Sequence, residues 1–551
     1  IVPVDGEIWN SCGTGPRNGR QGVQVERRSF FQSAAALAFG DAGAVRNGTS
    51  PEGGQPRVVA DPYVRFARSP HDWSAPPWVG APTIVRTGSG LLLASYTYFG
   101  EGSPMQTTFL VASADNGKTW RGVAEVSPLF WPSLFRTSSG LYLIGVDRPY
   151  EAGDNRLLIF RSGDDGRTWS KPSALTTGLR VHTGNTGVLI SKGRITRAIE
   201  VAPALSPAMP QTRTAAEFAV TGTDLNVREL ALPVENAAFL PHLLLAVSAA
   251  NQKLHCRVMR ADPERRVLTV RPESWPNQAN TPGPWRFPKG ADVRIATHLP
   301  DSNRDFLSMV LDASETADLC DPAAWRKSNL VVNPAYTYAT AAKELFGLDF
   351  TRKGAGWLEG VLLRLEHPGG SGKIVNLLRV QNEKTADISA RIEVDDSGEE
   401  LRCRFDRFAP APGLGIAHCS ATYDARSRLY WMASNVARDT TRDTSKTRLR
   451  MPATQERSNL GLFYSANSVD WFMAGLVAYA PDWVHSYHYP NLMVDGEDVI
   501  VVVRSHVESP LTEQTVGPKT ANRHDSNAAT FHRVRNFRGL ANLEFIRYRT
   551  T

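Results

Sequence analysis

The chain contains 551 residues, of which 42% are hydrophobic and 21% are charged, and its formal net charge is +7. That composition is typical of a globular protein with a large core, and no stretch is long and apolar enough to cross a bilayer. The basic excess is spread along the sequence, without runs of Lys or Arg interleaved with aromatic residues, so the charge does not indicate a nucleic-acid partner.

The first predicted element is an export signal. Arg27 and Arg28 precede an apolar, alanine-rich run over 30–39, and small residues at 42–44 offer a cleavage site. This order is typical of a twin-arginine signal and places the mature protein in the periplasm or outside the cell, whereas an ordinary Ala-rich helix start is the alternative. The expected organisation is residues 1–44 as a leader outside the fold, residues 45–74 as a linker and residues 75–548 as a single domain.

An eight-residue turn motif occurs twice, forty-nine residues apart, as SADNGKTW at 113–120 and SGDDGRTW at 162–169. In this pattern, S-x-D-x-G-x-T-W, the Ser and Asp side chains bond the backbone of a tight hairpin. Gly supplies a positive φ, and Trp packs onto the strands beneath. We therefore expect Asp115 and Asp164 to be structural rather than catalytic.

The repeat extends into the strands that precede each turn, because residues 84–93 match residues 134–143. A period near fifty residues, built from short strands, predicts the blades of a β-propeller. Later stretches with a similar cadence, including one decayed turn, are 188–199, 360–380, 465–471 and 492–503. We predict an all-β propeller of six blades, with seven as the alternative, and residues 201–350 do not fit the period clearly.

The two turns and the positions of four further residues resemble the sequence pattern of the sialidase superfamily. The resemblance extends from about Trp78 to the C-terminus. Glu359 begins a strand that leads to a Gly-containing turn, and Arg379 ends the next strand. Arg457 opens the strand before the decayed turn, and Tyr489 begins Y-P-N-L, which is similar to the family strand that presents a nucleophilic Tyr. The resemblance implies a sialidase-like propeller that acts as an exo-glycoside hydrolase, cleaving a terminal acidic sugar, sialic acid or a related keto-sugar acid, from a glycan.

The resemblance assigns a role to each of these residues. Tyr489 is the nucleophile, Glu359 is its general base, and Arg379 and Arg457 bind the substrate carboxylate. A carboxylate on the anomeric carbon repels an anionic nucleophile, whereas a phenol deprotonated during attack avoids this repulsion. Arginine binds carboxylates in bidentate fashion. This chemistry requires no metal and no organic cofactor, and the five cysteines have no metal-type spacing.

The sequence departs from the family pattern at two places. Gly80 stands where the family has the first Arg of its carboxylate-binding triad, and Arg86 and Arg136 are offset from that place. The family's acid/base Asp is replaced by Glu101, which becomes the candidate proton donor. The missing Arg at Gly80 favours a substrate other than an ordinary sialic acid.

Four more residues are candidates for substrate binding. His182 and Glu200 are expected on one blade, and His524 lies in a hydrophilic turn rich in His, Asp and Asn, which could equally satisfy only its own backbone. Tyr487 shares a face with Tyr489 if the strand is regular, because side chains alternate along a strand, but a bulge would change this.

Two other functions remain open. A propeller lyase would act on a uronate by β-elimination, with Tyr487 or Tyr489, His485 and His524 as the reacting groups. A propeller without catalytic activity would bind an acidic glycan and release nothing, which the missing first Arg at Gly80 favours. In all three cases the expected partner is an acidic glycan, with neither a nucleic acid nor a membrane span.

Overall fold

Residues 56–551 form one compact unit in the computed structural model. The structure describes residues 57–542 except for 153–154, 204–210, 222–228, 238, 240–243, 273–279, 296–305, 332–355, 382–384, 397, 399, 439–452, 483 and 513–523. The predicted leader, residues 1–44, lies outside the described residues. Within the described part of the chain, no helix is long and apolar enough to cross a membrane.

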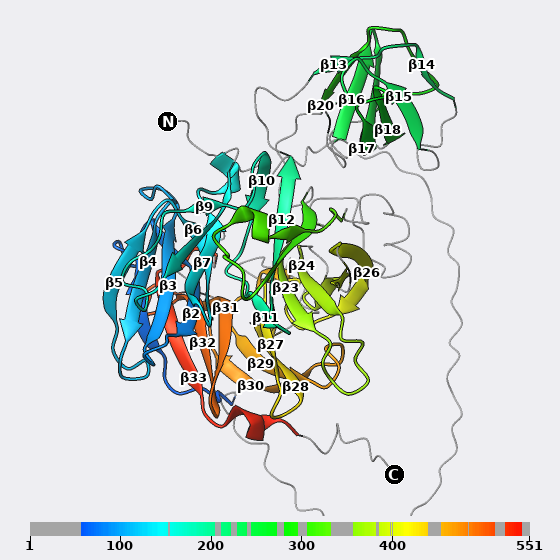
Figure 1. The fold of residues 1–551 in the computed structure, drawn as a ribbon. Helices are drawn as coiled ribbons and strands as arrows, with labels where there is room; N and C mark the ends of the chain where they lie inside the picture. Colours follow the sequence, from blue (N-terminus) through cyan, green and yellow to red (C-terminus); the bar gives the residue numbers. More distant parts are fainter. Residues whose placement is uncertain are drawn as a thin grey trace, which may run out of the picture. The chain divides into compact units, whose positions relative to one another are not determined.

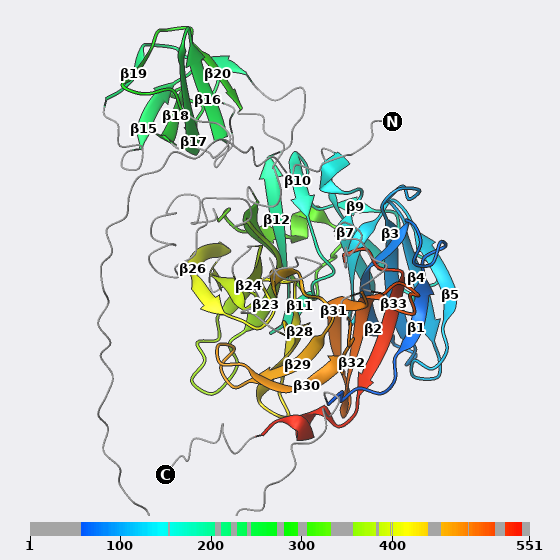
Figure 2. The same ribbon diagram turned by 180° about the vertical axis from the view of Figure 1, so that it is seen from behind.

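Six antiparallel sheets form the blades of a propeller, and their inner strands pack side by side (Figure 1 and Figure 2). The first blade contains β2 (Trp78–Arg86), β3 (Leu92–Phe99), β4 (Thr108–Ser113) and β5 (Arg121–Val126). The second contains β6 (Phe130–Thr137), β7 (Gly140–Val146), β8 (Leu157–Ser162) and β9 (Ser173–Ala174). The third contains β10 (Leu179–His182), β11 (Leu189–Ser191), β12 (Arg194–Pro203), β21 (Leu307–Ser314) and β22 (Arg326–Lys327).

The remaining three blades follow in chain order. The fourth contains β23 (Gly356–Arg364), β24 (Ile374–Gln381), β25 (Ile388–Asp395) and β26 (Arg402–Pro410). The fifth contains β27 (Ser420–Asp424), β28 (Leu429–Asn435), β29 (Leu460–Ser465) and β30 (Phe472–Ala478). The sixth contains β31 (Ser486–Asp495), β32 (Asp498–His506), β33 (Ala528–Val534) and β1 (Val64–Arg68). Short 3-10 helices are η1 (Tyr150–Ala152), η2 (Pro322–Ala324), η3 (Ala453–Gln455) and η4 (Phe537–Leu540).

The two ends of the propeller sequence meet in the sixth blade. Strand β1 pairs antiparallel with β33, so Val64 lies opposite Phe531. This pairing closes the ring of blades through backbone hydrogen bonds, and the exposed edge of β33 is thereby covered. The predicted linker over 45–74 therefore contains a strand of the propeller, and the domain boundary at residue 75 is too late.

The third blade is interrupted between β12 and β21 by a separate sheet. Its strands, in spatial order, are β13 (Thr212–Arg213), β20 (Asp292–Ile295), β16 (Leu244–Ala249), β17 (Gln252–Asp262), β18 (Val267–Pro272) and β15 (Leu230–Pro233). A second pair is β14 (Phe218–Val220) with β19 (Trp285–Phe287). This inserted sheet has a hydrophobic core of its own. The insertion explains why residues 201–350 do not follow the fifty-residue period.

The two turn motifs have the structural role that their pattern predicts. The Asp164 carboxylate accepts hydrogen bonds from the backbone N–H of Thr168 at 2.9 Å and from its hydroxyl at 2.6 Å. These bonds hold the pKa of Asp164 at about 2. The indole N–H of Trp169 donates to the Gly166 carbonyl at 3.0 Å, and Asp115 repeats the arrangement in the first blade. Neither carboxylate is a catalytic group.

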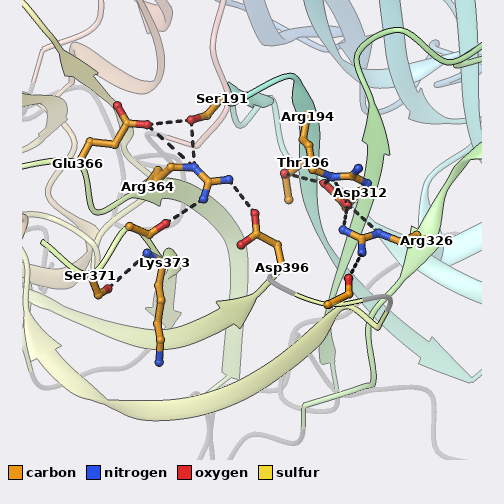
Figure 3. A network of polar contacts seen from close by, with 12 residues as sticks. Ser191, Arg194, Thr196, Asp312, Arg326, Arg364, Glu366, Ser371, Lys373 and Asp396 are labelled. Carbon is orange, nitrogen blue, oxygen red and sulfur yellow. Dashed lines mark hydrogen bonds and ion pairs between the residues drawn. The ribbon is translucent and has the colours of Figure 1, made fainter.

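A network of ion pairs connects the third and fourth blades (Figure 3). The fully buried Asp312 on β21 accepts from Arg194 at 2.7 Å and from Arg326 at 3.0 Å. Arg326 also donates to the Gly398 carbonyl at 2.7 Å, and Arg364 on β23 donates to Ser191 on β11 at 3.0 Å. Side chains of one blade thus bind groups of the next.

Candidate active site

Four inner strands share one irregularity, which in β2 is a shift of the pairing register between Gly80 and Thr83. The pairing register shifts at residues 131–132 in β6, at 359–360 in β23 and at 489–490 in β31. Trp131, Glu359 and Tyr489 have positive φ values of 46°, 58° and 52° there. Such a bulge turns a side chain out of the regular alternation, and non-glycine residues with positive φ are concentrated at functional sites. Alternate blades therefore present these three side chains in equivalent ways.

The three side chains line one small cavity between the inner strands. Its other lining residues are Gly184, Asn185, Arg504 and His524. The cavity measures about 20 Å³, which is the space of about one water molecule. It is therefore the floor of a site rather than a space that could enclose a sugar.

Arg379 joins Tyr489 to Glu359. Its Nη1 donates to Glu359 Oε2 at 3.0 Å and to the Tyr489 hydroxyl at 3.2 Å. All three side chains are buried, with 6–7% of each residue exposed. Three residues from three separate stretches of the sequence thus lie in direct contact, as the resemblance implied.

Burial alone would raise the pKa of the Glu359 carboxyl, but the charges of Arg379, His418 and His182 outweigh it, and the pKa lies below its usual range. Burial likewise opposes the charge of Arg379, but Tyr489 and Glu359 raise the pKa of its guanidinium. The pair is therefore a carboxylate and a guanidinium at neutral pH.

Two further arginines face the ring of Tyr489. The guanidinium carbon of Arg457 lies 5.6 Å from the ring centroid, and that of Arg504 lies 5.1 Å from it. Arg504 also stacks over Phe99 at 4.1 Å. Burial lowers the pKa of Arg504 to about 10, so it remains charged at neutral pH. Three buried cations thus surround one tyrosine.

Each of these arginines retains a buried Nε without a hydrogen-bond partner among the described residues. A buried charge with unsatisfied donors is costly unless an anion or another acceptor compensates it. Glu359 compensates only one of the three guanidinium groups directly. The electrostatic character of the site therefore favours an anionic ligand.

His524 lies beside Arg504 and near Tyr489, with the ring centroids of His524 and Tyr489 6.1 Å apart. Arg504 donates to its backbone carbonyl, and Asp525 Oδ1 lies 3.2 Å from its Nδ1. Burial, followed by the charge of Arg504, lowers the pKa of His524 to about 3. The imidazole is therefore neutral and can accept or relay a proton without carrying a fixed charge.

His182 and Glu200 lie at the bulge that carries Glu359. Glu200 Oε1 accepts a hydrogen bond from the Gly360 backbone N–H at 3.1 Å, and its Oε2 lies 3.4 Å from His182 Nδ1. Both residues are buried. Glu200 and His182 therefore support the backbone next to Glu359.

Tyr487 does not share a face with Tyr489, because the strand is not regular there. The bulge at 489–490 breaks the alternation. Tyr487 instead packs in the core against Tyr63 at 6.4 Å and His532 at 5.9 Å between ring centroids. His488, rather than Tyr487, lies beside the Tyr489 ring, at 4.9 Å.

Two other candidates lie outside the cavity. Glu101 is exposed in the turn after β3, away from the residues that line the cavity. His485 Nδ1 donates to Asp482 at 2.7 Å, and its Nε2 accepts from the Ser509 backbone at 3.3 Å. Both nitrogens of His485 are therefore engaged in a loop.

The sequence-based reasoning missed Trp131 and Arg504. Trp131 is half-buried, and its indole N–H has no acceptor among the described residues. An aromatic residue followed by Pro in an inner strand occurs at both Trp131 and Tyr489, and this shared dipeptide was the available signal. For Arg504 the signal was an Arg at the end of an apolar strand, the feature that pointed to Arg379.

A larger groove, of about 730 Å³, lies between the third and fourth blades. Its basic side chains are largely neutralised, because Arg402 pairs with Glu400 and both Arg404 and Lys373 pair with Glu393. None of the described residues that line it is a tyrosine or a histidine. The smaller cavity at Tyr489 is therefore the better candidate for catalysis.

The chain was compared with known proteins at the levels of sequence and structure. No family model and no curated protein matches it. Similar solved structures include an α-L-arabinanase of Penicillium chrysogenum complexed with arabinobiose, at 11% identity and TM-score 0.41, covering 87% of this chain and 98% of that one. The GH93 α-L-arabinofuranosidase of Fusarium graminearum has 10% identity and TM-score 0.42 over 87% and 98%. Trypanosoma rangeli sialidase has 11% identity and TM-score 0.41 over 86% and 56%. The likeness is one of fold.

Proposed function

We propose that the chain is a glycoside hydrolase that removes a terminal acidic sugar from a glycan, with Tyr489 as the nucleophile. The observation that carries this proposal is the contact of Tyr489 with both a buried carboxylate–guanidinium pair and two further buried arginines. A tyrosine that only filled space in the core would not need this much buried charge around it.

The arginines support an acidic substrate. Arg379, Arg457 and Arg504 come from β24, from the residues before β29, and from β32, and they converge on one ring. A carboxylate can accept paired N–H donors from a guanidinium, and such charge-assisted bonds are about twice as strong as neutral ones. A sugar carboxylate bound here would satisfy donors that the described residues leave unpaired.

The reaction begins at the Tyr489 hydroxyl. Arg379 beside this oxygen stabilises the phenolate, and Glu359, which is bound by the same Nη1, takes the proton. The phenolate oxygen attacks the anomeric carbon while the bond to the leaving oxygen breaks. The leaving oxygen takes a proton from the solvent, and Glu359 releases the proton of Tyr489 to the solvent. Water then cleaves the sugar–tyrosine bond and returns the proton to Tyr489. Two displacements give net retention.

One observation favours a second candidate, β-elimination on a uronate. Among the described residues that line the cavity, Glu359 is the only carboxylate, and it is already paired with Arg379, whereas the neutral His524 lies near Tyr489. In an elimination, a base removes the proton from the carbon beside the carboxylate, the bond to the leaving oxygen breaks, and a double bond forms. Arginine neutralises the carboxylate, and a tyrosine can protonate the leaving oxygen.

The deciding experiment compares the purified protein with its Tyr489→Phe variant on sialylated and uronate-containing glycans. Released acidic sugar and near-ultraviolet absorbance are recorded together. We expect release of an acidic sugar that falls by about 1,000-fold or more in Tyr489→Phe, because the substitution removes the reacting oxygen. The matched control is Tyr142→Phe, which removes another buried tyrosine hydroxyl, bonded to Ser139 in the second blade.

The other outcomes contradict the hydrolase. A rise in near-ultraviolet absorbance without release of the acidic sugar by hydrolysis indicates the elimination. If neither released sugar nor a rise in absorbance is detected, but calorimetry shows that the same glycans bind, the chain is a binding protein. Equal activity of Tyr489→Phe and Tyr142→Phe would remove Tyr489 from the mechanism.

A further inference from the structure

We infer that Asn185 is a positioning residue that fixes the backbone of Tyr489 from across the centre of the propeller. The inference rests on the proposed function for the role of Tyr489, and it concerns a residue outside the reaction itself. Asn185 belongs to the His182–Asn185 stretch of the third blade, whereas Tyr489 lies in the sixth.

The inner edge of the third blade is interrupted at this point. Strand β10 ends at His182 and β11 begins at Leu189, and both pair with the same neighbour, β12. Residues 183–188 therefore leave the sheet between two segments that belong to one strand position. They form a loop, which we call the axial loop.

The axial loop contacts the second and fourth blades through its backbone and a hydroxyl. Thr183 Oγ1 donates to the Trp131 carbonyl at 3.2 Å, and the Ser133 hydroxyl donates to the Thr186 carbonyl at 2.5 Å. Gly184 lies against Glu359, since a Cβ at Gly184 would be only 3.2 Å from the Glu359 Cγ. The loop therefore touches two of the three bulges that line the cavity.

Asn185 reaches the remaining three blades. Its Nδ2 donates to the Pro82 carbonyl of the first blade at 2.8 Å and to the Tyr489 carbonyl of the sixth at 3.1 Å. Its Oδ1 faces His418 Nε2, ahead of the fifth blade, at 2.6 Å. With both amide hydrogens given to carbonyls, Oδ1 can only accept, so His418 Nε2 is the donor. All the polar atoms of this amide are used.

The bond to Tyr489 compensates a specific defect of the sheet. The register of β31 shifts between His488 and Asn491, so the Tyr489 carbonyl lies outside the regular ladder. A buried carbonyl needs a donor, and a non-glycine residue with positive φ costs about 1–3 kcal/mol unless the surroundings hold it. Asn185 supplies that donor, and it thereby stabilises the bulge that points the Tyr489 ring toward Arg379.

The axial loop is itself held from behind. The fully buried Arg197 on β12 donates through Nη1 to the Thr186 carbonyl at 3.0 Å and through Nη2 to the Gly184 carbonyl at 2.8 Å. The carbonyls on either side of Asn185 are thus fixed, so the amide cannot follow Tyr489 if that residue moves. This rigidity is what a positioning residue requires.

The test uses the full chain with three variants. Asn185→Ala removes the whole amide, and Asn185→Asp keeps the shape and an acceptor but loses both N–H donors. The matched control is Asn155→Ala, because Asn155 is equally buried and makes three hydrogen bonds, to Arg148 and Val181, away from Tyr489. We expect kcat on the acidic glycan to fall by about 100-fold in both Asn185 variants. KM should stay within about threefold, because the arginines remain.

A second readout does not depend on activity. In protein labelled with 3-fluorotyrosine, the fluorine resonance of Tyr489 is the one missing from Tyr489→Phe. We expect this resonance to move and broaden in both Asn185 variants and to stay in place in Asn155→Ala. An unmoved resonance in a folded Asn185 variant overturns the inference, as does an equal kcat loss in the control. If the parent protein cleaves no acidic glycan but the resonance moves, the proposed function fails while the positioning role stands.

Discussion

At the residue scale, Arg504 is a third buried cation at the Tyr489 ring, beside Arg379 and Arg457. Arg504 ends the apolar run 499–503 of β32, and its guanidinium lies between the rings of Phe99 and Tyr489. Because Phe99 ends β3, Arg504 connects the last blade with the first. The spacing of residues in the sequence could not indicate this contact, because Phe99 and Arg504 are more than four hundred residues apart.

We predict that Arg504→Met raises KM for the acidic substrate by about 10- to 100-fold, since a hydrogen bond to a charged group contributes about 1.5–3 kcal/mol. Steady-state kinetics on the free acid and on its methyl ester measure this effect. KM for the methyl ester should change little in the variant, because the ester has no carboxylate charge for Arg504 to bind. The matched control is Arg533→Met, whose buried guanidinium pairs with Asp495 and Asp498 in the same blade. A similar KM increase in both variants would contradict the assignment of Arg504.

At the element scale, the contact between neighbouring blades depends on buried polar groups as well as on apolar cores. Asp312 on β21 binds Arg194 on β12 and Arg326 on β22, and Arg326 extends to the fourth blade (Figure 3). This arrangement secures a blade whose sequence is split by an inserted sheet.

We predict that Asp312→Ala lowers the free energy of unfolding by about 3 kcal/mol, because removal of the buried carboxylate leaves two half-buried guanidinium groups uncompensated. Urea denaturation followed by tryptophan fluorescence measures the change. Glu400→Ala is the control: its ion pair with Arg402 is largely exposed, and such a pair contributes below about 1 kcal/mol. Equal losses of unfolding free energy in the two variants would show that the network around Asp312 stabilises the fold no more than an exposed ion pair does.

At the scale of the whole molecule, several buried histidines make stability depend on pH. His532 on β33 is 2% exposed, and burial lowers its pKa to about 3. In the unfolded chain the imidazole titrates near pH 6.5, so only the unfolded state gains the proton between about pH 6.5 and about pH 3. The stabilising contribution is therefore fully present above pH 6.5 and is lost as the pH falls.

We predict that His532→Gln reduces the slope of unfolding free energy against pH by up to about 1.4 kcal/mol per pH unit below pH 6.5. Gln can keep the contact with the Thr530 hydroxyl, which lies 2.9 Å from His532 Nε2. Denaturation curves between about pH 7.5 and about pH 4.5 measure the slope. The exposed His71, replaced by Gln, should leave the slope unchanged, and an unchanged slope in His532→Gln would refute the prediction.

The sequence by itself determined the repeating unit. Residues 113–120 and 162–169 form their turns through bonds among neighbours, so the pattern reveals both the turn and the blade beneath it. The alternation of apolar strands revealed most blades for the same reason. Such features depend on contacts within a few residues of one another, which the linear order contains.

Only the tertiary structure decided which side chains meet. Glu359, Arg379 and Tyr489 could be proposed from a resemblance, but their contact depends on bulges at 359–360 and 489–490, and a one-residue change of register reverses the direction of a strand side chain. Because of the register shift at 489–490, Tyr487 packs in the core instead of beside Tyr489. Arg504 and Asn185 act on Tyr489 across the ring, through contacts between distant segments that leave no local pattern in the sequence.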